Sequence, residues 1–133
     1  MKMKIIPDKQ ILLFVRVKGK KGVREFQAVL DTGSEYSRIP LGAARELGYE
    51  AYVDTDIEVG IGKPAVTQGA IFEANEIVIE EIIVADLVAR NVKALACDLP
   101  RIAGVEALLG INFLKNFRTT IDYKKGYLTI EPF

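Results

Sequence analysis

The sequence predicts a single, mainly β domain with one or two short helices. Two observations support this expectation. Short β-branched and apolar runs recur at close spacing between glycine-containing turns, which is typical of an all-β barrel. The length of 133 residues, half of them apolar, suits one domain with its own core. Because no linker, domain-sized repeat or low-complexity segment interrupts the pattern, we treat residues 1–133 as one domain forming a closed or nearly closed barrel.

Strands are expected along the whole chain. Two alternating runs flank the turn Gly19 to Gly22 and predict an opening hairpin, and a second, glycine-rich turn is expected at Gly60 to Pro64. The segment from Glu73 to Ala96 contains helix-forming Ala and Glu, but its Ile and Val runs favour strands by roughly three to one, with a turn near Asn91. The expected strands outside that segment are residues 11–18, 23–30, 36–39, 52–59, 65–72, 118–122 and 127–130.

Two short helices complete the predicted fold. Pro40 keeps the residues before it extended, and a helix is expected from Leu41 to Leu47 with Gly48 as its stop signal. A second helix is expected from Asn112 to Asn116, after a buried apolar run that ends at Gly110.

Composition excludes several functional classes. With 18 basic and 18 acidic residues the formal net charge is zero, so a nucleic-acid surface is not expected. His is absent and Cys97 is the single cysteine, which argues against a zinc site, a disulfide framework and a His-dependent triad. The first apolar stretch is broken by Pro7 and Asp8, and no apolar run is long enough to cross a bilayer. We therefore expect a cytoplasmic protein that does not bind membranes.

The run Ala28 to Leu30 leads into Asp31-Thr32-Gly33, a motif that occurs once in the chain. Aspartic peptidase chemistry needs two facing carboxylates that share one proton. The ionised carboxylate takes a proton from a water that attacks the peptide carbonyl, and the protonated one donates to the carbonyl oxygen. A chain with a single motif supplies the second carboxylate only from another copy of itself, so the sequence predicts a homodimer.

The neighbours of Asp31 suit this role. Gly33 allows close approach of the backbone, Thr32 can donate a hydrogen bond to main chain, and we expect Ser34 to hydrogen-bond the neighbouring carboxylate. Asp-Thr-Gly-Ser is also good turn chemistry, and the bare motif is catalytic in roughly one case in ten. A structural barrel with a turn aspartate therefore stays open as an alternative, and titration in one step instead of two coupled steps would identify it.

Three segments together resemble the retropepsin-like, single-domain aspartic proteases. They are Ala28 to Ser34, the glycine-containing hairpin near Val59 to Gly69, and Ala107 to Leu114. The ending, from Lys115 to Ile130, is similar to that of cellular members more than to that of retroviral ones. The resemblance spans roughly residues 10 to 131 and implies the acid protease fold.

The resemblance implies an aspartic endopeptidase that cuts extended peptide segments, with no metal or organic cofactor. Asp31 is its catalytic residue, supported by Thr32, Gly33 and Ser34. The flap is assigned to Gly60, Ile61 and Gly62, and the packing behind the catalytic loop to Leu108, Leu109 and Gly110. The alternative from another class is a catalytically idle dimerisation or peptide-binding module of the same fold.

Some features depart from the retroviral pattern. Retroviral members carry an arginine after the glycine of the third motif, and this chain has Ile111 there, which leaves Glu35 without that partner. The extra residues around 73–91 are expected to cover the cleft or enlarge the interface. Arg38 and Arg90, like Glu35, are candidate substrate contacts, but solvated charges or loop ion pairs are expected at roughly four to one.

Overall fold

The computed structural model describes residues 1–50, 62–67, 70–98 and 105–133. In chain order its elements are β1 Lys2–Lys4, β2 Leu12–Gly19, β3 Gly22–Leu30, β4 Ser37–Ile39, α1 Leu41–Glu46, β5 Gly62–Thr67, β6 Ala70–Val84, β7 Leu87–Ala96, β8 Ala107–Leu109, α2 Ile111–Leu114, β9 Arg118–Asp122 and β10 Tyr127–Glu131.

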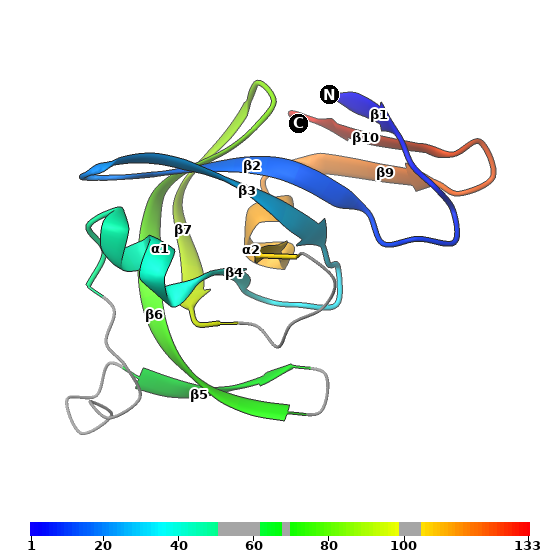
Figure 1. Cartoon of the computed structure of the whole chain (residues 1–133). Helices are drawn as coiled ribbons and strands as arrows, with labels where there is room; N and C mark the ends of the chain where they lie inside the picture. Colours follow the sequence, from blue (N-terminus) through cyan, green and yellow to red (C-terminus); the bar gives the residue numbers. More distant parts are fainter. Residues whose placement is uncertain (51–61, 68–69, 99–104) are drawn as a thin grey trace.

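The body of the molecule is a closed β barrel (Figure 1). Its strands follow the order β2, β3, β8, β4, β7 and β6, and pairing of β2 with β6 closes the ring. The predicted mainly β fold with two short helices is therefore confirmed. None of the helices in the described ranges is long and apolar enough to cross a membrane.

Alternation of side chains along the opening hairpin explains why the barrel forms. Leu13, Val15 and Val17 of β2 are buried, whereas the residues between them are exposed, and β3 shows the same alternation. A period of two is the signature of a strand with one face on the core. The predicted hairpin is confirmed, with its reversal between Gly19 and Gly22.

The β6–β7 hairpin corrects two predictions. The chain reverses between Val84 and Leu87, and Asn91 lies inside β7 instead of marking a turn. Asn91 has a φ of 54°, a left-handed conformation that Asn tolerates better than most residues, so its turn chemistry is accommodated within a strand. Residues 75–84 and 87–91 lie in β6 and β7 of the ring, a role that the expectation of an insert did not foresee, whereas residues 73 and 74 pair with β5.

The β5–β6 hairpin corrects a third prediction. Gly62 and Pro64 lie in β5 and pair with β6, so the expected turn at residues 60–64 is wrong where the structure describes it. The pairing runs to Thr67 opposite Ala70, so residues 65–67 and 70–72 belong to two paired strands and not to the single strand expected at residues 65–72. Pro64 is tolerated because β5 is an edge strand. The expected strand at residues 52–59 lies outside the described residues.

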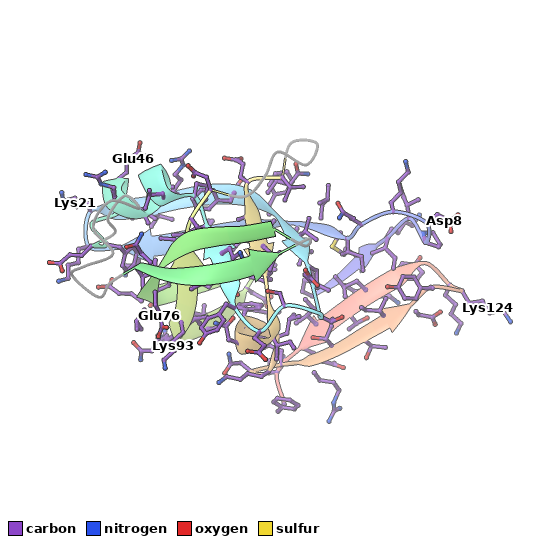
Figure 2. The ribbon with its side chains drawn as sticks, turned by 90° about the horizontal axis from the view of Figure 1, so that it is seen from below. Asp8, Lys21, Glu46, Glu76, Lys93 and Lys124 are labelled. Carbon is purple, nitrogen blue, oxygen red and sulfur yellow. The ribbon has the colours of Figure 1, made fainter. Side chains whose placement is uncertain are left out.

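A second, three-stranded sheet joins the two ends of the chain. Strand β1, which the sequence pattern missed, pairs with β10, and β10 pairs with β9 as predicted for the last hairpin. Leu128 and Ile130 of β10 are fully buried and join the barrel core. Figure 2 shows Asp8 and Lys124 at this end of the molecule and Lys21 and Glu46 at the opposite end.

Candidate active site

Asp31 follows the last residue of β3, where the strand leaves the barrel. Strand β3 runs parallel to β8, with Val29 opposite Leu108 and Leu30 opposite Leu109. The backbone N–H of Asp31 continues this ladder by donating to the carbonyl of Leu109 at 2.9 Å. This hydrogen bond joins the start of the Asp31 loop to the end of β8.

The carboxylate of Asp31 is held from its own loop. The backbone N–H of Gly33 donates to Asp31 Oδ1 at 2.9 Å. A Cβ at residue 33 would lie 3.2 Å from the same oxygen, which is tight, so a glycine suits this turn. Asp31 is partly exposed, and Thr32 and Gly33 are exposed. The single chain therefore presents this carboxylate at its surface.

Ser34 does not make the bond expected of it. Its Oγ donates to the carbonyl oxygen of Tyr36 at 2.8 Å, and a hydroxyl has one hydrogen to donate. Ser34 therefore does not donate to the carboxylate of Asp31 in this conformation. Its role is to fold the loop that follows the motif.

The loop after Asp31 is tied to the start of α2. Ile111 N–H donates to the carbonyl of Ser34 at 2.7 Å, and Asn112 N–H donates to that of Glu35 at 3.1 Å. A Cβ on Gly110 would lie 2.5 Å from the carbonyl oxygen of Tyr36, closer than packed atoms tolerate. Gly110 is required because two backbone segments cross at this residue.

Ser37 and Asn112 form a polar network under this crossing that the sequence analysis missed. Ser37 Oγ accepts from Gly110 N–H at 3.0 Å and donates to Asn112 Oδ1 at 2.9 Å. Asn112 Oδ1 also accepts from Ser37 N–H, and Asn112 Nδ2 donates to the carbonyl of Lys93. The network joins β4, α2 and β7. The available sequence signal was a pair of small polar residues beside buried apolar runs.

The comparisons with known proteins agree with this geometry. Residues 16–116 match the family model described as gag-polyprotein putative aspartyl protease, well over half of the chain. The chain belongs to this family. Its structure is similar to the crystal structure of a retropepsin-like aspartic protease from Rickettsia conorii, with a TM-score of 0.66 and 18% identity, covering 98% of this chain and 88% of that chain. The fold is therefore retropepsin-like. A search among curated proteins found no match.

The other candidate residues of this aspartyl protease family member have different surroundings. Arg90 is exposed and pairs with Glu81 at 3.4 Å, as expected for a surface ion pair, and Glu35 is exposed. Arg38 is buried, so its expected place among solvated charges is wrong. Gly62 begins β5 opposite Asn75, whereas residues 60 and 61 lie outside the described residues.

A hollow of about 250 Å³ adjoins Asp31 and Thr32. Its other walls are Lys9 and Gln10, which precede β2, and Ile121 and Tyr123 from the end of β9. In the described part of the chain, no cluster of acidic, Cys or His side chains is arranged to hold a metal ion. The chemistry that the described residues offer at this place is that of a carboxylate in an open, partly apolar setting.

Proposed function

We propose that the chain is an aspartic endopeptidase whose active site forms from Asp31 of two copies. The observation that carries the proposal is the placement of Asp31. It lies at a strand end, fixed by the bonds from Gly33 N–H and to Leu109, yet partly exposed at the surface. Family membership supports the activity, and the single Asp-Thr-Gly motif supports a site shared by two chains.

The mechanism follows from two carboxylates at hydrogen-bond distance. Because two negative charges so close repel each other, the pair holds one proton between them. The ionised Asp31 takes a proton from a bound water while its oxygen attacks the carbonyl carbon, and the protonated Asp31 gives its proton to the carbonyl oxygen. When the C–N bond breaks, the leaving nitrogen takes a proton from the dyad and the carbonyl forms again.

Each supporting residue has a defined task in this proposal. Thr32 hydrogen-bonds across the two-fold axis, and Gly33 allows the two loops to approach. Leu109 and Gly110 hold the loop from behind through the contacts described above. The peptide binds as an extended strand beneath the β5–β6 hairpins, with main-chain hydrogen bonds supplying affinity.

The decisive experiment compares wild type with Asp31→Asn on a peptide library from pH 3 to 8. We expect cleavage by wild type and at least a thousandfold loss in Asp31→Asn, because an amide does not accept the proton of water. The matched control is Asp86→Asn in the exposed β6–β7 turn, which should cleave like wild type. Light scattering should give twice the chain mass, and activity per mole should fall on dilution.

Two outcomes would contradict the proposal. An active Asp31→Asn protein would remove the catalytic role of this carboxylate. A well-folded wild-type dimer that retains peptide without cutting it at any pH would identify the idle binding module instead.

A further inference from the structure

The loop that carries Asp31 has little apolar packing to fix its shape. It runs from the end of β3 to the start of β4, and none of residues 31–36 is buried. A segment with few buried apolar contacts opens easily. A pair of carboxylates that shares a proton needs the opposite, because a displacement of about 1 Å at a reacting group can cost about a hundredfold in rate. The shape of this loop therefore depends on hydrogen bonds.

Asn112 of α2 holds the far end of the loop at two places. Its backbone N–H donates to the carbonyl of Glu35 at 3.1 Å. Its side-chain Oδ1 accepts from Ser37 N–H at 3.0 Å and from Ser37 Oγ at 2.9 Å. Figure 1 shows α2 beside β4, which begins at Ser37. One residue thus fixes the direction in which the chain leaves the loop and enters β4.

The other end of the same amide is anchored to the wall of the barrel. Asn112 Nδ2 donates to the carbonyl of Lys93 in β7, a strand that pairs with β6 in the ring. An amide group accepts and donates hydrogen bonds at once, whereas an ionised carboxylate only accepts them. Asn112 therefore joins the exposed loop to a strand of the barrel, which a side chain without a donor would not do.

Ser37 carries this support to the backbone of Asp31. Its hydroxyl is in a residue only 1% exposed and accepts from Gly110 N–H at 3.0 Å. Gly110 follows Leu109, whose carbonyl accepts from Asp31 N–H at 2.9 Å. A continuous path of backbone and hydrogen bonds thus leads from the Asn112 amide to Asp31. Neither Ser37 nor Asn112 is among the described residues that line the hollow beside Asp31.

We propose that Asn112, acting with Ser37, is a positioning residue that holds the Asp31 loop in the geometry that the carboxylate pair requires, which rests on the proposed peptidase function. Removing the amide frees the loop and takes no group away from the hollow where the peptide meets Asp31. The rate constant kcat should therefore fall while KM changes little. A purely structural support would instead lower stability and leave the kcat of the folded protein unchanged.

The first measurement is backbone amide hydrogen exchange, followed by NMR, in wild type and Asn112→Ala. The reporters are the amides of Asp31 and Ile111, which donate to the carbonyls of Leu109 and Ser34 and not to Asn112. Each lost hydrogen bond contributes roughly a fivefold factor to the opening equilibrium, so we expect exchange at least about tenfold faster. The amides of β2, which report opening of the whole barrel, should change less.

The second measurement is peptide cleavage at a concentration where light scattering shows the full dimer mass. We expect kcat of Asn112→Ala to fall about 10- to 100-fold, with KM within about threefold of wild type. Ser37→Ala should lower kcat in the same way. The double variant should be only slightly worse than Asn112→Ala, because the two residues belong to one path and their effects are coupled.

Two aspartate variants provide a graded comparison and a matched control. Asn112→Asp keeps the acceptor for both bonds from Ser37 and loses the donation to Lys93, so it should show a smaller change of the same kind. It decides the question if Asn112→Ala does not fold. Asn116→Asp adds the same charge near the end of α2, where Asn116 donates to the carbonyls of Asn112 and Phe113. Its loop exchange and kcat should equal those of wild type.

The outcomes separate this inference from the proposed activity. Lower stability of Asn112→Ala with loop exchange and kcat as in wild type would overturn the positioning role. Equal acceleration of the loop and β2 amides would also overturn it, because the effect would then belong to the whole barrel. If wild type cuts no peptide but Asn112→Ala still opens the loop selectively, only the peptidase proposal fails.

Discussion

The two faces of the sheet formed by β3, β8, β4 and β7 follow different rules. The inner face carries mainly apolar side chains from these strands; the exceptions are Arg24 near the start of β3 and the Ser37 hydroxyl that serves the network under Gly110. The outer face carries Arg38 among Leu108, Leu95 and Cys97, and Asp31 directly follows the end of β3. One residue of displacement along a strand thus moves a side chain from the barrel core to the opposite face of the sheet.

Adjacent leucines of β8 test this difference most strongly. Leu109, 2% exposed in the core, and Leu108, 9% exposed outside it, have the same chemistry on opposite faces. We expect Leu109→Ala to lower the free energy of unfolding by about 2–5 kcal/mol, the range for a leucine removed from a packed core. Leu108→Ala should lower it clearly less and reduce kcat/KM for peptides more. Urea unfolding and peptide cleavage per folded protein measure the two effects, and equal stability losses would show that the faces do not differ.

The buried hydroxyl of Ser37 on the inner face should give the next largest effect on stability. Ser37→Ala leaves the buried N–H of Gly110 without its acceptor, and we expect the free energy of unfolding, measured in urea, to fall by about 1–3 kcal/mol.

Ser34→Ala removes a partly buried hydrogen bond to the carbonyl of Tyr36 and should lower the free energy of unfolding by about 0.5–1.5 kcal/mol. Because Ser34 donates to Tyr36 and not to Asp31, its removal should leave the acidic limb of the pH–rate profile in place. A shift of that limb would mean that the hydroxyl turns to the carboxylate in the dimer.

The sequence predicted which side chains face the core where apolar and polar residues alternate along a strand. It failed where one residue determines the place of a turn or a buried contact. The period of two in β2 and β3 and the Asp-Thr-Gly motif located the hairpin and the loop, because both signals are local. The turns at residues 60–64 and 91 were misplaced, since Pro64 fits an edge strand and Asn91 fits a left-handed position inside β7. The burial of Arg38 and the Ser37–Asn112 network arise from the meeting of β4, β7, β8 and α2, which no local pattern records.

The smallest effect is expected at the seam between β2 and β6, away from both faces. The Tyr49 hydroxyl donates to the carbonyl of Lys18 and accepts from Glu80 N–H at 2.9 Å, bridging the two strands. Tyr49→Phe breaks this bridge and should lower the free energy of unfolding by about 1 kcal/mol at pH 7, with peptide cleavage unchanged. A change in cleavage per folded protein would mean that a loss of stability anywhere in the barrel alters the active site, and the two faces could not then be told apart by cleavage.

The same variant makes a prediction about pH. Burial raises the pKa of the Tyr49 phenol above its ordinary value of 10.0, with the hydrogen bond from Glu80 acting in the opposite direction. A raised pKa means that the folded state favours the neutral phenol. The stabilisation that the neutral phenol contributes is fully present below pH 10, and it is lost as the pH rises through the pKa of Tyr49 in the folded state. Wild type should therefore lose stability relative to Tyr49→Phe as the pH rises above 10, as measured by urea unfolding in both proteins. A constant difference across that range would show that the phenol titrates alike in the folded and unfolded chains.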